Sequence, residues 1–209
     1  MLLLQPFLDP LPLIAILRGV TPEEVVPIGR VLRDAGFAIV EVPLNSPRPL
    51  ESIRLLRDDL GADLLVGAGT VIAPDEVKQV AAAGGRLIVM PHGDTAVIRA
   101  AKSAGLICTP GVATPTEGYT ALEAGADALK LFPAEMLTSQ VLRAMRSVFP
   151  ADTLFLPVGG ITPDTMAPFI EAGAAGFGLG SALYKPGIDA ATVGANARAF
   201  AEAWRRSIA

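Results

Sequence analysis

The sequence is poor in the side chains that build disulfides and zinc sites, since its 209 residues include one cysteine, Cys108, and one histidine, His92. A single cysteine cannot form a disulfide within the chain, which is typical of proteins in the reducing cytoplasm. Two such ligands are also too few for a structural zinc site, although metal sites built from carboxylates stay open. We therefore expect a cytoplasmic protein in which His92 lies in a loop and Cys108 is a small core residue.

An excess of positive charge is also absent, because 17 Lys and Arg stand against 21 Asp and Glu, for a net charge of −4. This balance argues against a nucleic-acid partner, which would need clustered cations to neutralise its phosphates. The longest segment without a charge, between Lys102 and Glu117, is shorter than the roughly 20 apolar residues of a membrane span. The amino terminus lacks a basic segment and a small-residue cleavage site, so we expect neither a signal peptide nor a membrane partner.

The residues that are abundant are small and apolar. Hydrophobic residues make up 51% of the chain but aromatic residues only 5%. Such a composition suits closely packed parallel strands and helices, or a subunit that buries a further face in an oligomer. No linker, charge run or low-complexity segment interrupts the chain, so residues 1–209 are interpreted as a single domain.

Short signals for helix ends and helix starts recur along the chain. Glycine just past a helix end adopts the left-handed conformation at no steric cost, and a capping residue followed by proline favours a helix start. The predicted ends are Ala35-Gly36, Ala83-Gly84, Ala104-Gly105, Ala124-Gly125 and Ala172-Gly173, and the predicted starts are Thr21-Pro22, Ser46-Pro47, Ala73-Pro74 and Thr162-Pro163.

Eight apolar runs between these signals predict parallel strands, each belonging to one β/α unit. Eight units in one domain indicate an α/β fold of the (β/α)8 barrel type, with an N-terminal segment and a closing helix near Asp189 to Arg206. A doubly wound open sheet is the weaker alternative, because its glycine fingerprint after the first strand is absent. The eight runs are Leu13–Leu17, Ile39–Val42, Leu64–Val66, Leu87–Val89, Leu106–Cys108, Ala128–Leu131, Leu154–Val158 and Gly176–Leu179.

Two charged residues stand inside these apolar runs, Lys130 in the sixth and Glu41 in the second. Lysine is rarely buried unless it is paired or functional. Lys130 has two interpretations. It is either a structural residue, which snorkels out at the strand end or pairs with Glu41, or a desolvated amine that forms a Schiff base, its pKa lowered further by a cation such as Arg18. Glu41 is correspondingly either a structural partner or a general acid and base. An amine nucleophile beside a carboxylic proton shuttle is the minimum equipment of an imine-forming aldolase.

Glycine-rich loops follow the seventh and eighth predicted strands, at Gly159-Gly160 and Gly180-Ser181. Loops at these positions of a barrel commonly bind phosphate through backbone N–H groups. A single glycine pair often makes only a tight turn, but two such loops on successive strands favour phosphate. The hydroxyl and free N–H groups around Thr70 offer a weaker candidate site for a substrate carboxylate.

From Leu13 to the last helix, the chain resembles the class I aldolases that act on 2-keto-3-deoxy-6-phospho sugar acids. The resemblance implies a homotrimeric barrel that takes a small phosphorylated keto acid and needs no metal or other cofactor. It also implies that Lys130 is the Schiff-base lysine, Glu41 the proton shuttle and Phe132 the border of the imine. Arg18 and Thr70 would contact the substrate, and Gly159, Gly160, Gly180 and Ser181 would hold the phosphate. The motifs that carry the resemblance are Ile16–Gly19, Glu41–Pro47, Gly67–Thr70, Ala128–Pro133 and Val158–Pro163.

Two substitutions within these motifs bear on the substrate. Gluconate-type members of the family carry an arginine where this chain has Asn45 and a threonine where it has Val158, so the chain resembles the galactonate-type members. Asn45 cannot offer the bidentate charge of arginine, which leaves more of that work to Arg18, and Val158 lacks a hydroxyl that could contact C4. The expected reaction is cleavage of 2-dehydro-3-deoxy-6-phospho-D-galactonate to pyruvate and D-glyceraldehyde 3-phosphate.

Several alternatives stay open at this stage. The same chemistry on the gluconate epimer or on 4-hydroxy-2-oxoglutarate is one of them. A phosphosugar isomerase, epimerase or synthase would use paired acids and bases or metal ligands rather than a lysine in an apolar strand. A non-enzymatic sugar-phosphate sensor would keep the glycine loops but would have no need of Lys130 and Glu41.

Overall fold

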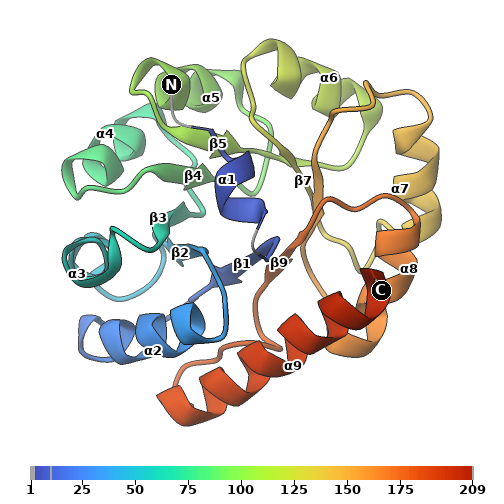
Figure 1. The fold of residues 1–209 in the computed structure, drawn as a ribbon. Helices are drawn as coiled ribbons and strands as arrows, with labels where there is room; N and C mark the ends of the chain where they lie inside the picture. Colours follow the sequence, from blue (N-terminus) through green and yellow to red (C-terminus); the bar gives the residue numbers. More distant parts are fainter. Residues whose placement is uncertain (1–2, 10, 209) are drawn as a thin grey trace.

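A computed structural model describes residues 3–9 and 11–208 as an α/β fold, with parallel strands inside and helices outside (Figure 1). Six strands form one sheet in the order β5-β4-β3-β2-β1-β9, and three form a second in the order β6-β7-β8. The chain runs from β5 into β6 across Pro110, and Val158 after β8 forms a parallel bridge with Gly178 of β9. The strands are β1 (Leu13–Ile16), β2 (Ile39–Pro43), β3 (Leu65–Gly69), β4 (Leu87–Val89), β5 (Ile107–Thr109), β6 (Gly111–Val112), β7 (Leu129–Leu131), β8 (Phe155–Pro157) and β9 (Phe177–Leu179).

Helices α2 to α9 lie around the outside of the strands, and α1 lies amid them (Figure 1). The predicted closing helix is confirmed as α9, which packs against α2 and α8. The helices are α1 (Gln5–Leu8), α2 (Pro22–Asp34), α3 (Pro49–Leu60), α4 (Pro74–Ala82), α5 (Thr95–Ser103), α6 (Pro115–Glu123), α7 (Ser139–Arg146), α8 (Met166–Glu171) and α9 (Ala190–Ile208), and a 3₁₀ turn, Pro163–Thr165, precedes α8.

The local signals in the sequence correspond closely to these elements. A strand forms within or beside each of the eight predicted runs, and all five Ala-Gly pairs follow the last residue of a helix. The five glycines have φ between 73° and 103°, so each sits in the left-handed region that its lack of a Cβ permits. The predicted starts at Thr21 and Ala73 are the N-caps of α2 and α4, and Thr162 begins the 3₁₀ turn.

The predicted helix start at Ser46-Pro47 is wrong. Helix α3 begins at Pro49, and its N-cap residue is Arg48, with φ of 45°. The Ser46 hydroxyl instead accepts a hydrogen bond of 2.9 Å from the Gly19 backbone N–H. A side chain that links two loops by a hydrogen bond is not available to cap a helix. This contact between distant segments cannot be predicted from the local sequence pattern.

The strands separate two apolar clusters. One lies between the strands and the outer helices, and the other lies on the inner face of the curved strands, where Ile14, Ile39, Leu65 and Leu87 meet. Helix α1 adds Leu4 and Leu8 to the inner cluster and is seen amid the strands in Figure 1. The N-terminal segment therefore covers one end of this inner cluster, and the functional residues lie farther along the strands.

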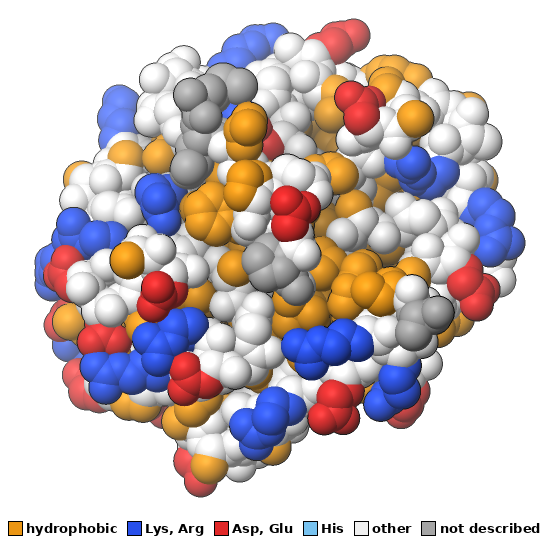
Figure 2. Space-filling model, in the orientation of Figure 1, with side chains coloured by type: hydrophobic (Ala, Val, Ile, Leu, Met, Phe, Trp, Pro, Cys, Tyr) orange, Lys and Arg blue, Asp and Glu red, His pale blue; other side chains and the backbone are white. Residues whose placement is uncertain are grey.

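The face that carries α1 is shown in Figure 2. Side chains of both charge signs are interspersed over α2 and α3, while hydrophobic side chains gather near the centre and toward α7 and α8. The part of this face over α2 and α3 therefore offers no uniformly positive surface. Within residues 3–9 and 11–208, no helix combines the length and apolar character needed to cross a membrane.

Candidate active site

Lys130 is the central residue of β7 and is 6% exposed. Its neighbours Leu129 and Leu131 pack in the cluster between strands and helices. Because side chains alternate along a strand, Lys130 projects to the opposite, inner face of the strands. Its Nζ atom lies 4.6 Å from the centroid of the Phe132 ring, close enough for the ring face to attract a cation.

Glu41 is the central residue of β2 and is 1% exposed. Its Oε2 atom is buried and has no hydrogen-bond partner among the described residues. On the neighbouring strand, a Cβ atom added at Gly69 would overlap the Glu41 carboxyl group. The absence of a side chain at Gly69 is therefore what makes room for this carboxyl group.

The pKa values of Glu41 and Lys130 are both shifted from their ordinary values. Burial raises the pKa of Glu41 to about 7, against the opposing effect of the Lys130 and Arg18 charges. Burial also lowers the pKa of Lys130; the Glu41 charge opposes this shift and the Arg18 charge adds to it. A lowered pKa increases the fraction of neutral, nucleophilic amine, and a carboxyl pKa near 7 suits a group that both takes and gives protons.

Arg18 connects the pair to two further residues predicted to bind substrate. Its guanidinium donates a hydrogen bond of 2.7 Å to the Asn45 side-chain carbonyl and one of 3.3 Å to the Thr70 hydroxyl. Thr70 has a φ of 56°, an unusual conformation for a β-branched residue. Asn45 and Thr70 thus hold Arg18 in place. The sequence did not predict this role of Asn45.

A cavity of about 480 Å³ unites most of the predicted site. Glu41, Asn45 and Thr70 do not line it and are linked to it through Lys130 and Arg18. Gly159 and Gly160, with φ of 110° and 66°, form part of one wall, and the Glu135 side chain lies against them. The predicted site residues that line the cavity are Arg18, Lys130, Phe132, Val158, Gly159, Gly160, Gly180 and Ser181.

Three further residues with polar or charged side chains line the same cavity and were not predicted from the sequence: Glu135, Tyr184 and Lys185. The Tyr184 hydroxyl is buried without a hydrogen-bond partner in the described chain, and burial together with the Glu24 charge raises its pKa to about 12. Lys185 follows Gly180-Ser181 by four residues, and Glu135 follows Phe132 by three. Their short distance in sequence from the predicted site residues was the only signal that could have identified them. This signal is weak, because most residues so close to such a loop are ordinary surface side chains.

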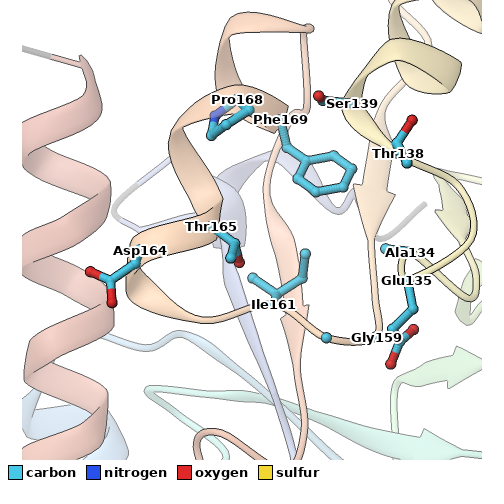
Figure 3. Close-up of a pocket in the computed structure, with 11 residues that line it drawn as sticks. Ala134, Glu135, Thr138, Ser139, Gly159, Ile161, Asp164, Thr165, Pro168 and Phe169 are labelled. Atoms are coloured by element: carbon cyan, nitrogen blue, oxygen red, sulfur yellow. The ribbon is translucent and has the colours of Figure 1, made fainter.

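A second cavity of about 370 Å³ adjoins the first and shares Glu135, Gly159, Gly160 and Ile161 with it. Figure 3 shows the Phe169 ring and Ile161 pointing into this cavity, the Glu135 carboxylate beside Gly159, and Asp164 directed away. Its lining mixes apolar side chains with the hydroxyls of Thr138, Ser139 and Thr165. It offers no amine or guanidinium, so the chemistry of the site is concentrated in the first cavity.

Cys108 and His92, for which the sequence predicted a core and a loop position and no role in the site, lie outside this arrangement. Cys108 is buried in the outer cluster, where burial raises its pKa to about 12, and His92 is exposed in a bend. Within the described residues, no three His, Cys, Asp or Glu side chains come together in a way that could hold a metal ion. The predicted residues thus bring together one buried amine, one buried carboxyl, one guanidinium and a glycine-rich backbone.

Comparison with known proteins agrees with this geometry. A family model described as KDPG and KHG aldolase matches residues 5–195. The 2-dehydro-3-deoxy-6-phosphogalactonate aldolase of Escherichia coli (strain K12) is 47% identical, over 95% of this chain and 97% of its own. The probable 2-dehydro-3-deoxy-6-phosphogalactonate aldolase of Rhizobium meliloti (strain 1021) is 46% identical, over 87% and 86% of the two chains. A solved structure described as native KDPGal superposes with a TM-score of 0.94 at 46% identity, covering 95% of this chain and 96% of that one. This chain belongs to the KDPG and KHG aldolase family.

Proposed function

We propose that the protein is a class I aldolase that cleaves 2-dehydro-3-deoxy-6-phospho-D-galactonate to pyruvate and D-glyceraldehyde 3-phosphate. The observation that carries the proposal is a buried amine, Lys130, with a lowered pKa, beside a buried carboxyl, Glu41, whose pKa is raised to about 7. The names of the relatives from Escherichia coli and Rhizobium meliloti support this substrate. No metal or other cofactor is required, because the imine itself serves as the electron sink.

The reaction begins when the neutral Lys130 amine attacks the C2 ketone of the substrate. The resulting carbinolamine loses water, with Glu41 supplying the proton that the departing hydroxide needs. The product is a cationic imine between Nζ and C2. The Phe132 ring, whose centroid lies 4.6 Å from Nζ, presents a π face that favours this cation.

Cleavage follows from the charge on the imine. Glu41, now a carboxylate, accepts the proton of the C4 hydroxyl, and the electrons of the C3–C4 bond pass to the imine. Glyceraldehyde 3-phosphate leaves as the aldehyde, and an enamine of pyruvate stays on Lys130. Protonation at C3 regenerates the imine, and water hydrolyses it to release pyruvate and the free amine. A pKa of about 7 lets one carboxyl group serve each of these transfers.

The rest of the cavity holds the two ends of the substrate. Gly159, Gly160, Gly180 and Ser181 present backbone N–H groups and a hydroxyl to the phosphate. Arg18 and Thr70 contact the carboxylate end of the substrate. Asn45 acts by orienting the Arg18 guanidinium, which donates a hydrogen bond of 2.7 Å to the Asn45 side-chain carbonyl. Val158 presents a hydrocarbon surface near C4, which favours the galactonate configuration over the gluconate one.

The same proposal includes the finer features of fold and assembly. The strands close into one (β/α)8 barrel, because β5 continues into β6 and a bridge joins Val158 to Gly178. The chain acts as a single domain and assembles as a homotrimer in the cytoplasm. Light scattering at catalytic concentrations tests the trimer, for which the expected mass is three times 21.6 kDa.

The decisive experiment is to incubate the protein with pyruvate and borohydride and to locate the added mass by peptide mass spectrometry. Reduction converts the imine to a stable secondary amine, so the expected result is an adduct on Lys130. Lys130→Met should give none while keeping the circular dichroism spectrum of the fold. No adduct in the unmodified protein, or one spread over Lys78, Lys102 and Lys185, would contradict the mechanism. Comparing turnover of the galactonate and gluconate epimers then tests the substrate.

A further inference from the structure

The first cavity is lined by three basic side chains, of which two have other roles. Lys130 acts as a neutral nucleophile, and the Arg18 guanidinium donates hydrogen bonds to Asn45 and Thr70. Lys185 is the third, and it forms no ion pair with any residue of the described chain. One positive charge at the cavity wall is therefore still available to a ligand.

An anion entering the glycine-rich end of the cavity meets an unfavourable charge. The Glu135 carboxylate lies directly against Gly159, so that a Cβ atom added at Gly159 would overlap it (Figure 3). A Cβ atom added at Gly160 would lie 2.8 Å from the Cγ atom of Glu135. Glu135 forms no ion pair with the described residues. A phosphate at these loops therefore approaches a like charge, and neutral N–H groups alone do not offset it.

Lys185 lies in the loop after β9, which lines the first cavity together with the Gly159–Gly160 loop. Gly180 and Ser181 begin this loop, and the Leu183 and Tyr184 backbone N–H groups both bond to the Gly180 carbonyl. Tyr184 is 2% exposed. Pro186 packs closely on Gly19: a Cβ atom added at Gly19 would lie 2.7 Å from the Cγ atom of Pro186. Anchored residues on both sides thus fix the backbone of Lys185, while its side chain is exposed.

We propose that the Lys185 ammonium binds the substrate phosphate, as the side-chain cation of a subsite otherwise made of backbone N–H groups and the Ser181 hydroxyl. This inference rests on the proposed function and deepens it. Lys185 also offsets the Glu135 charge, so the two residues set the affinity for the phosphate in opposite directions.

Lys185→Met removes the charge and keeps most of the side-chain length, and Lys78→Met is the matched control, because Lys78 lies on α4 and pairs with Asp75 instead. KM for the phosphorylated keto acid should rise about five- to tenfold in Lys185→Met with kcat little changed, as for the loss of one partly exposed ion pair. KM for the same keto acid without its phosphate should not move. Glu135→Gln should lower KM for the phosphorylated substrate, and added salt should weaken binding less in Lys185→Met than in the unmodified protein.

An unchanged KM for the phosphorylated substrate in Lys185→Met would overturn the inference, and so would an equal rise for the substrate that lacks phosphate. Binding of inorganic phosphate, followed by ³¹P line broadening, tests the subsite without turnover. If pyruvate and borohydride fail to label Lys130 while phosphate binds more weakly to Lys185→Met, the proposed function fails and the phosphate subsite stands. If Lys130 is labelled and phosphate binding is unchanged, the subsite fails and the function stands.

Discussion

Replacing Glu41 with glutamine is expected to abolish turnover and to stabilise the folded protein above neutral pH. Burial raises the pKa of Glu41 from 4.5 to about 7, so the folded protein binds the proton more tightly than the unfolded chain does. At pH values well above 7, the buried carboxylate therefore opposes folding by about 3 kcal/mol, from roughly 1.4 kcal/mol per pKa unit. Below pH 4.5 the group is protonated in both states, and this penalty vanishes. Stability thus falls as pH rises from 4.5 through 7.

Glutamine has nearly the same shape and carries no charge at any pH. Glu41→Gln should therefore differ little from the unmodified protein at pH 4.5 and should be more stable at pH 8. For a chain of this length, a difference of about 3 kcal/mol corresponds to roughly 6–12 °C in Tm. The loss of the Glu41 charge also removes a favourable partner of the Lys130 ammonium and so lowers the pKa of Lys130 further. This effect reduces the stability gained in Glu41→Gln.

Differential scanning calorimetry at a series of pH values and one fixed protein concentration makes this measurement, because oligomers melt in a concentration-dependent way. The difference in Tm between the variant and the unmodified protein should grow steadily between pH 4.5 and 8. A difference that is constant over this range would refute the reasoning, since it would show that Glu41 does not titrate there. In the unmodified enzyme, kcat/KM should fall as pH rises through about 7, because the free enzyme then loses the protonated Glu41 that supplies the proton to the departing hydroxide.

Three further substitutions test the geometry of the site. Asn45→Asp should pair with the Arg18 guanidinium and raise KM about tenfold with a smaller change in kcat; an unchanged KM would show that Arg18 does not bind the substrate. Gly69→Ala should displace the Glu41 carboxyl group and lower kcat by about two orders of magnitude in a folded protein, whereas full activity would contradict the packing. Val158→Thr should increase turnover of the gluconate epimer relative to the galactonate one, and an unaltered ratio of kcat/KM values would remove Val158 from the specificity of the enzyme.

The parts of this protein that the sequence predicted well depend on local physics. The glycine after each of five helices supplies a conformation that other residues adopt only under strain, so those helix ends could be placed within a residue or two. Apolar runs of regular spacing predicted the eight strand segments because each is buried by the helix that follows it. Lys130 and Glu41 were conspicuous because charge inside an apolar strand is costly to fold and needs a reason.

The parts that it missed depend on contacts between distant segments. Ser46 has the composition of a helix cap, and only the position of Gly19 shows that its hydroxyl serves another loop. The role of Asn45 in holding Arg18 requires that two strand ends come within hydrogen-bond distance. Lys185 and Glu135 look like ordinary surface charges until the cavity is assembled around them.

The sequence by itself therefore determined the alternation of helices and strands, the family, and the two residues whose chemistry is out of place in an apolar core. Only the tertiary structure decided the ionisation of that pair, because the pKa of a carboxyl or an amine depends on how completely its neighbours exclude water and how near other charges lie. It also decided which polar side chains around the cavity are bound to one another and which are left for a ligand, since hydrogen bonds across strands and loops arise from distances that no local pattern contains.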